Sequence, residues 1–190
     1  MQDRLALHVE AMGLMDAVVQ RVTDDDLGRP TPCAGWTVAD LLAHEVGQHL
    51  GFAAAVRDGD APESAYAPVP FTGESWRGSV EALMTAFAAA DPDAPVIERE
   101  ITETPLPLRV LVDAQLLDLL AHSWDLATGL GDDFEPPEHL AADFVRMARA
   151  IPDRAYGEGH AFSERLTPDG TDWEQGLRLL GRDPGWSPAG

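Results

Sequence analysis

The sequence predicts a single, mainly helical domain, and two observations carry this prediction. Apolar residues recur at three- and four-residue steps in several long segments, as they do on one face of an α-helix. Stretches rich in Gly, Pro and Asp separate these segments and interrupt regular structure. The chain has 190 residues, which is long enough for one domain with a substantial core and short for two large ones.

Five long helices and one short helix are expected in order along the chain. The first carries an apolar stripe from Leu5 to Val22, and the second starts after Thr37, an N-cap residue that precedes the acidic first-turn residue Asp40. The fourth is apolar on nearly every face, which predicts a central, buried helix that ends at Gly129. The expected ranges are 3–22, 38–56, 74–90, 109–130 and 137–151, with the short helix over 172–180.

The segments between these helices predict little regular structure. Alternating residues between Val96 and Leu108 permit a short β-hairpin, which two prolines confine to an edge. Residues 58–73 are expected to hold no regular element, because Gly, Pro and Ala dominate them. We therefore expect residues 1–151 to form the helical bundle and residues 152–190 to form a C-terminal extension packed on it.

The acidic balance of the chain excludes several classes of partner. Thirteen Lys and Arg against 33 Asp and Glu give a formal charge of -20, spread along the sequence. Such a surface repels nucleic acid and anionic lipid. No apolar run approaches the roughly 20 residues of a membrane helix, and the first residues show no signal-peptide pattern, so a cytoplasmic location is expected. The single Cys33 allows neither an internal disulfide nor a multi-cysteine zinc module.

Polar residues within the fourth expected helix indicate a functional site. Asp118 and His122 stand four residues apart and so project from one helical face, with Asp125 one turn further along it. A carboxylate and an imidazole in an apolar helix are costly to bury unless they are paired or bound to a metal. In the second expected helix, His44 sits among leucines and can also face inward. Three such donors from two helices would form the open-sided site expected of catalytic zinc.

Simpler interpretations of these residues stay open. Asp118 and His122 can form a buried hydrogen-bonded pair, which their spacing favours at least equally. A histidine such as His44, taken alone, is more often a core residue than a ligand. Cys33 is either a thiol activated near a helix N-terminus or a small buried hydrophobe.

The remaining histidines give weaker indications. The segment HEVGQH resembles a zinc protease motif, but its histidines are five residues apart where that motif needs four, so we reject a protease. Glu45 and His49 form another pair at a spacing of four, which we expect on a solvated face. Surface or structural roles are expected for the three histidines without a partner at ligand spacing: His8, His139 and His160.

Three longer motifs carry a resemblance to a known family. They are TPCAGWTVADLLAHEVGQ, LLDLLAHSWDLATGLG and the closing LLGRDPGW. Together they resemble the DinB-like superfamily and, more narrowly, the N-terminal domain of mycothiol-dependent maleylpyruvate isomerase and its single-domain relatives. The resemblance implies an all-α, four-helix up-down-down-up bundle. It also implies a divalent metal, with zinc the first candidate and nickel the second, held by His44, Asp118 and His122, where Asp118 replaces the glutamate of the isomerase.

The resemblance leads to one main hypothesis about function and one alternative. The main hypothesis is a transferase or isomerase in which the metal binds a low-molecular-weight thiol such as mycothiol, which then attacks a small electrophilic molecule. Asp125 would accept a hydrogen bond from a ligand imidazole and orient it. We expect residues 152–190 to be too few to replace the separate C-terminal domain of the isomerase, so maleylpyruvate isomerisation itself is not expected. The alternative is a non-catalytic bundle that binds a metal or small ligand at a vestigial or structural site. A homodimer formed through one bundle face is compatible with either.

Overall fold

The computed structural model describes residues 2–99, 101–157 and 161–188 of this largely helical chain. All six helices expected from the sequence are present, with ends that differ by up to three residues from the expected ones. The helices are α1 (Gln2–Val19), α2 (Val38–Asp58), α3 (Gly73–Ala89), α4 (Leu108–Leu130), α5 (Glu138–Ala150) and α6 (Asp172–Leu179). Short 3-10 helices are η1 (Asp24–Asp26), η2 (Glu63–Tyr66) and η3 (Asp153–Ala155), and the strands are β1 (Pro95–Val96) and β2 (Leu106–Pro107).

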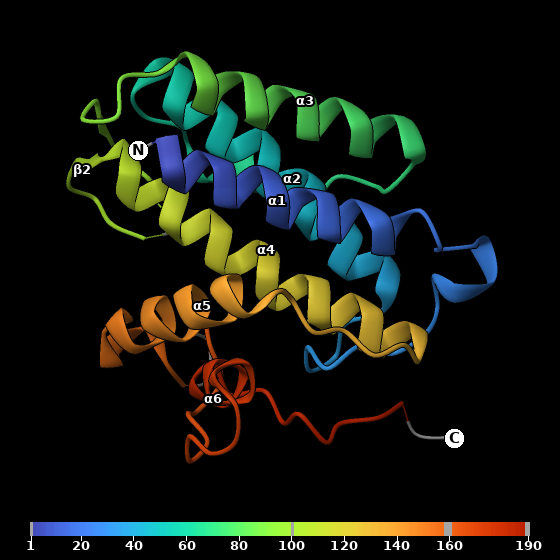
Figure 1. Ribbon diagram of the computed structural model, residues 1–190. Helices are drawn as coiled ribbons and strands as arrows, with labels where there is room; N and C mark the ends of the chain where they lie inside the picture. Colours follow the sequence, from blue (N-terminus) through green and yellow to red (C-terminus); the bar gives the residue numbers. More distant parts are fainter. Residues whose placement is uncertain (1, 100, 158–160, 189–190) are drawn as a thin grey trace.

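Helices α1 to α4 form a four-helix bundle (Figure 1). Around the bundle, α1 packs against α4, α4 against α2, α2 against α3, and α3 against α1. In Figure 1, α1 and α4 run from left to right while α2 and α3 run from right to left. The predicted up-down-down-up order is therefore confirmed.

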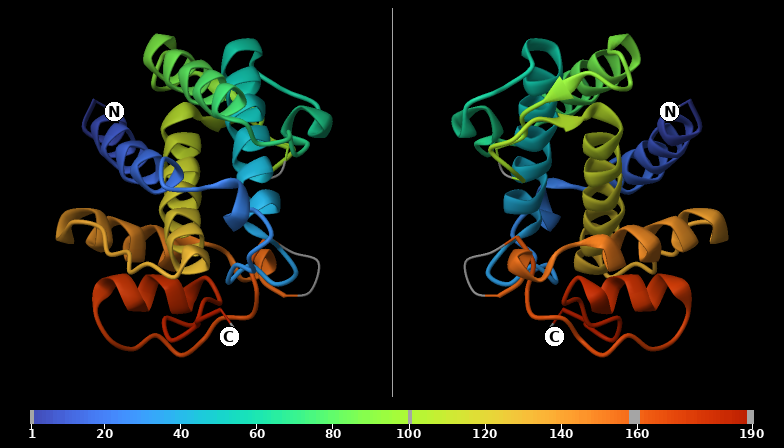
Figure 2. Two further views of the ribbon diagram at one scale, coloured as in Figure 1. Left: turned by 90° about the vertical axis from the view of Figure 1, so that its right-hand side faces the viewer. Right: turned by 90° about the vertical axis from the view of Figure 1, so that its left-hand side faces the viewer.

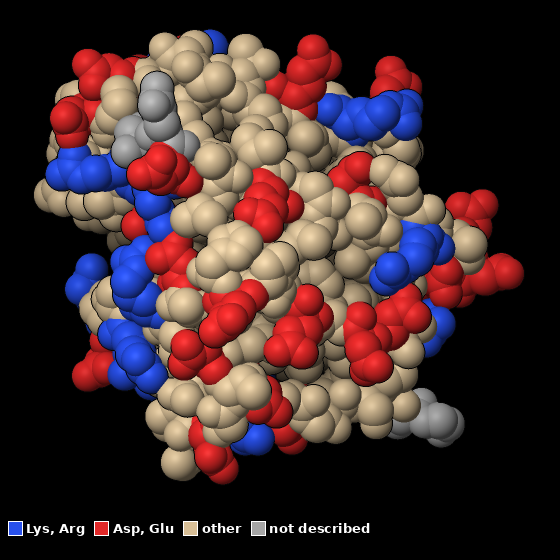
Figure 3. Space-filling view, viewed as in Figure 1, with Lys and Arg blue, Asp and Glu red and all other residues tan. Residues whose placement is uncertain are grey.

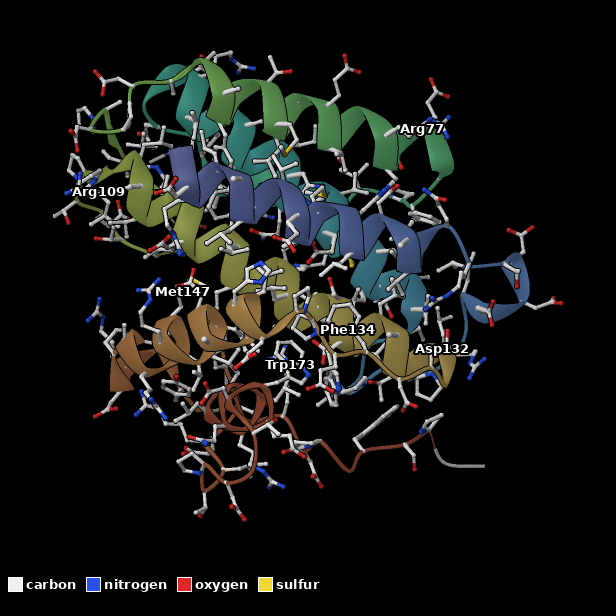
Figure 4. The ribbon with its side chains drawn as sticks, viewed as in Figure 1. Arg77, Arg109, Asp132, Phe134, Met147 and Trp173 are labelled. Carbon is white, nitrogen blue, oxygen red and sulfur yellow. The ribbon has the colours of Figure 1, made fainter. Side chains whose placement is uncertain are left out.

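The last two helices lie on one side of this bundle, next to α4 (Figure 2). Helix α5 packs against both α4 and α6. The indole ring of Trp173 fills the space beside α5, with its centroid 4.5 Å from that of Phe144 and 5.9 Å from that of Phe134 (Figure 4). Helix α5 thus connects the bundle to the C-terminal segment, and a boundary after residue 151 stays a prediction.

The start of α2 follows the capping pattern predicted from the sequence. The Thr37 hydroxyl accepts a hydrogen bond from the backbone N–H of Asp40, and the Asp40 carboxylate accepts one from the backbone N–H of Thr37 at 2.9 Å. These bonds satisfy N–H groups that a helix N-terminus otherwise leaves without partners. The cap fixes the first turn of α2, two turns before His44.

Helix α4 ends at Leu130, as the expected range has it, but the glycine that ends it is not the predicted one. Gly129 lies inside the helix, which continues to Leu130, and Gly131 ends it with a φ of 84° in the left-handed region. Gly129 has another role, because a Cβ at this position would lie only 3.1 Å from the carbonyl oxygen of Pro30. The glycine therefore lets the loop that carries Cys33 approach α4 closely.

Two expectations about the connecting segments have different outcomes. The hairpin is confirmed as two antiparallel residue pairs between β1 and β2. Residues 58–73 were expected to hold no regular element, which is wrong, because η2 lies within them. Its Tyr66 is buried against α2, where Gly51 leaves room for the ring because any larger residue would collide with it.

Acidic side chains dominate the surface, as the net charge requires. On the face shown in Figure 3, they are scattered across the centre, while basic side chains gather mainly toward the left edge. Among the described residues, no helix combines the length and the apolar character that crossing a membrane requires.

Candidate metal centre

The three predicted ligands meet where α2 packs against α4. His44 comes from α2, and Asp118 and His122 come from successive turns of α4. One donor atom from each of them lies within 4.8 Å of the others, and the same holds for one donor atom of Glu45. The Nε2 atom of His122 is 3.4 Å from Oδ1 of Asp118. The structure thus brings the predicted residues together, and metal binding by them stays a prediction.

The group is open to solvent on one side. The Asp118 side chain is 29 % exposed and His44 is half-buried, whereas His122 is buried. The half-buried ring of Trp36 lies beside both imidazoles, with its centroid 4.9 Å from that of His44 and 6.1 Å from that of His122. The aromatic ring of Trp36 is thus a direct neighbour of both imidazoles.

Asp125 lies behind His122 and holds it in place. The Nδ1–H of His122 donates to Oδ2 of Asp125 at 2.9 Å. Arg182, which follows α6, donates to the same carboxylate from Nη2 at 2.6 Å and from Nε at 3.0 Å. The Asp125 side chain is completely buried, and only 13 % of the Arg182 side chain is exposed. The contact predicted between Asp125 and an imidazole is present, and its role stays a prediction.

Arg182 is not among the site residues predicted from the sequence. The residue lies 57 positions from its partner, in a segment without helical periodicity. The available signal was the closing motif LLGRDPGW, which contains this arginine and contributed to the family resemblance.

Cys33 lies beside Asp125, His122 and Arg182, on the side of His122 that faces away from Asp118. Its Sγ is 3.2 Å from Oδ2 of Asp125, 3.8 Å from Nδ1 of His122 and 4.0 Å from an Arg182 nitrogen. Cys33, His122 and Asp125 thus form a second group of atoms close enough to hold an ion. The half-buried thiol lies beside charged groups, so the interpretation as a simple buried hydrophobe does not describe it.

The charges of the site are mutually dependent. Burial opposes charge on His122, but Asp118 and Asp125 outweigh it and raise its pKa well above the ordinary value. Burial also opposes charge on Asp118, yet His122 lowers the pKa of this carboxyl to about 2. For Asp125, the charge of Arg182 overcomes burial and holds the pKa below its usual range. Burial lowers the pKa of His44 to about 4, so this imidazole is neutral and able to bind a metal at neutral pH.

The prediction for the pair Glu45 and His49 is wrong. It was expected on a solvated face, and both side chains are completely buried. The Nε2 atom of His49 is 3.6 Å from Oε2 of Glu45, and its Nδ1 lies 3.1 Å from the Ser79 hydroxyl of α3. The physical reason is that α2 packs between α3 and α4, which cover more of its circumference than one apolar stripe indicates. Burial, assisted by the charge of Asp118, raises the pKa of Glu45 to about 8.

The other histidines have structural or surface positions. His8 is completely buried, and its Nε2–H donates to the side-chain oxygen of Gln115. His139 is exposed and lies 2.8 Å from a carboxylate oxygen of Glu10. His160 is outside the described residues.

Comparison with known proteins identifies the family. Residues 9–127 match the mycothiol maleylpyruvate isomerase N-terminal domain. This chain belongs to that family. Two relatives from Mycobacterium tuberculosis are the uncharacterized proteins MT0763 (strain CDC 1551 / Oshkosh) and Rv0738 (strain ATCC 25618 / H37Rv). Each is 28 % identical over 169 residues, which cover 85 % of this chain and 87 % of the relative.

Solved structures of the family have the same fold. A crystal structure of the mycothiol-dependent maleylpyruvate isomerase matches 97 % of this chain and 90 % of its own, with a TM-score of 0.69 and 14 % identity. A histidine-to-alanine mutant of such an isomerase matches 88 % of this chain and 76 % of its own, with a TM-score of 0.62 and 15 % identity. The resemblance predicted from the sequence is confirmed for family and fold.

The family match covers most of the candidate site. His44, Asp118, His122 and Asp125 all lie within residues 9–127, as does Cys33. Arg182 lies outside this range, so the C-terminal segment adds a charged group to a site that the family domain otherwise supplies.

Proposed function

We propose that this chain is a divalent-metal-binding member of the mycothiol maleylpyruvate isomerase N-terminal domain family. In this proposal it uses a low-molecular-weight thiol of the mycothiol type to transfer or isomerise a small electrophilic molecule. The observation that carries the proposal is the convergence of donor atoms from His44, Asp118 and His122 within 4.8 Å, at a place that solvent reaches. The family name supports the thiol.

The donor set suits a transition-metal ion. Two imidazoles and one carboxylate form a ligand set common at zinc sites, and imidazole also suits nickel. Within the described part of the chain, Oδ2 of Asp118 is buried and has no hydrogen-bond partner. A buried carboxylate oxygen without a partner is costly, and a cation would satisfy it. We propose zinc as the first candidate and nickel as the second.

The residues around the ligands have separable roles. A bound divalent ion supplies Lewis-acid chemistry that keeps a coordinated thiol deprotonated. Asp125 accepts the Nδ1–H of His122, so that Nε2 is the nitrogen facing Asp118. Arg182 neutralises Asp125 and fixes its orientation. The thiol and its substrate would approach from the side on which Asp118 and His44 are partly exposed.

The test begins with metal content. Protein purified without a His-tag or chelator is compared by elemental analysis with a His44→Ala, His122→Ala double mutant and with His139→Ala, a control at an exposed histidine. We expect nearly one equivalent of metal in the wild type and the control, and none in the double mutant, with circular dichroism showing retained helix content. Equal metal in all three proteins contradicts the ligand assignment.

Activity then separates catalysis from binding alone. Metal-loaded protein is incubated with a thiol and a small electrophile, and consumption of the electrophile is followed. We expect turnover that requires both the metal and the thiol. A fully loaded but inert protein favours the non-catalytic metal- or ligand-binding bundle. Absence of metal from the wild type instead reduces Asp118 and His122 to a buried hydrogen-bonded pair.

A further inference from the structure

Glu45 is a buried carboxyl group without adequate polar partners. Its side chain is completely inaccessible to solvent, and among the described residues neither carboxylate oxygen has a hydrogen-bond partner. Its contact with Nε2 of His49 spans 3.6 Å, which is too long for a hydrogen bond. Burying such a group without compensation costs free energy, so a compensating partner is expected at this position.

Glu45 lies next to the candidate metal centre, which can supply this partner. The residue directly follows His44 in α2, and one of its oxygens lies within 4.8 Å of donor atoms from His44, Asp118 and His122. Helix α2 therefore brings two adjacent donors to the site, as α4 brings two donors one turn apart. Asp118 and His44 are partly open to solvent, whereas Glu45 reaches the same group of atoms from the interior of the bundle.

We propose that Glu45 is a fourth protein ligand of the metal ion, contributed from the buried side of the site. This inference rests on the metal centre of the proposed function and extends its ligand set. A divalent ion displaces the proton of His122, and the resulting two neutral imidazoles and two carboxylates balance the charge of the ion, which suits a site with one buried side. The ion in turn compensates the carboxyl group of Glu45 and the Oδ2 atom of Asp118, which has no hydrogen-bond partner among the described residues.

A competition titration of Zn²⁺ against a chromophoric chelator tests this ligand. The variants are Glu45→Gln, which keeps the shape and removes the charge, and Glu98→Gln, a control at an equally buried glutamate outside the donor group. We expect Glu45→Gln to weaken Zn²⁺ binding at least about tenfold, because even residues beyond the ligands alter metal affinity by that order. The control retains wild-type affinity.

Cobalt gives a second readout independent of activity. The visible absorption of the Co²⁺-loaded protein depends on the number and type of ligands, so Glu45→Gln shifts this spectrum while Glu98→Gln does not. Circular dichroism verifies the fold of each variant. If Glu45→Gln does not fold, Glu45→Met, which places an apolar group in the buried position, replaces it.

The outcomes separate this inference from the proposed function. If Glu45→Gln keeps the wild-type Zn²⁺ affinity and Co²⁺ spectrum, Glu45 is a neutral structural partner of His49 and not a ligand. The three-ligand site of the proposed function then stands. A wild-type protein that binds neither ion overturns both.

Discussion

Two neighbouring groups of buried polar residues meet the cost of burial in opposite ways. The outer group contains His122, Asp125 and Arg182, which are charged and joined by hydrogen bonds of 2.6 to 3.0 Å. The inner group contains the histidines His8 and His49, for which burial dominates. It lowers the pKa of His8 to about 4 and that of His49 to about 3. The outer group keeps its charges by pairing them, and the inner group remains neutral.

The difference has consequences for stability. A charge in the outer group depends on its partner, so removal of one member leaves another buried and uncompensated. A neutral histidine in the inner group depends instead on pH, because its protonation is incompatible with the folded interior. Substitution of a residue in the outer group should therefore lower the free energy of unfolding at neutral pH. For the inner group, the free energy of unfolding should instead fall as the pH is lowered.

The largest effect is expected from Asp125→Asn. The substitution keeps the size of the side chain but leaves Arg182 without its carboxylate, in a place where only 13 % of the Arg182 side chain is exposed. Breaking such a buried pair costs about 3 kcal/mol or more in the free energy of unfolding. Urea denaturation of the wild type and the variant measures this loss.

A surface pair provides the control for this variant. Asp132, just beyond the end of α4 (Figure 4), lies 2.9 Å from Nη2 of Arg21, and about half of each side chain is exposed. Asp132→Asn should cost less than about 1 kcal/mol, because solvent screens such pairs. If Asp125→Asn and Asp132→Asn lose equal amounts of unfolding free energy, the buried ion pair contributes no more to stability than the exposed one.

His8 should control stability in mild acid. The folded pKa of about 4 lies below the ordinary 6.5, so its contribution is complete above pH 6.5 and is lost as pH falls toward 4. Between these two pKa values the loss in the free energy of unfolding amounts to about 3 kcal/mol. His8→Gln can still donate to Gln115 but does not titrate, so its free energy of unfolding should fall less between pH 6.5 and 4. Denaturation series at several pH values measure the difference.

The exposed His139 separates this effect from general acid destabilisation. It lies on the surface beside Glu10, and His139→Gln should follow the wild-type pH curve. Parallel curves for all three proteins would mean that the interior tolerates a charged His8.

The outer group was largely predictable from the sequence, because it depends on local spacing. A separation of four residues places Asp118 and His122 on one face of α4, and the next turn brings Asp125 beside them. The cap at Thr37 likewise depends on residues that are adjacent in the chain. Arg182 was not predictable in this way, because tertiary packing alone brings it to Asp125.

The inner group was less predictable, because spacing shows which residues share a face but not how many faces are covered. His49 of the inner group shares a face of α2 with its neighbour Glu45, as expected, but that face is buried and not solvated. The opposite error occurred in α1, where the apolar stripe predicted from Leu5 to Val22 includes Val9, which is 53 % exposed. The arrangement of neighbouring helices decides both cases.

The smallest effect is expected from Cys33→Ser, which distinguishes the two groups of donor atoms that share His122. One group uses its Nε2 with Asp118, and the other uses Nδ1 with Asp125 and the Cys33 thiol. Because Arg182 already neutralises Asp125, we expect the metal on the Nε2 side. Cys33→Ser should then keep the wild-type metal content in elemental analysis and the wild-type Zn²⁺ affinity. Loss of the metal would place it between Cys33 and Asp125 and would make the thiol a ligand.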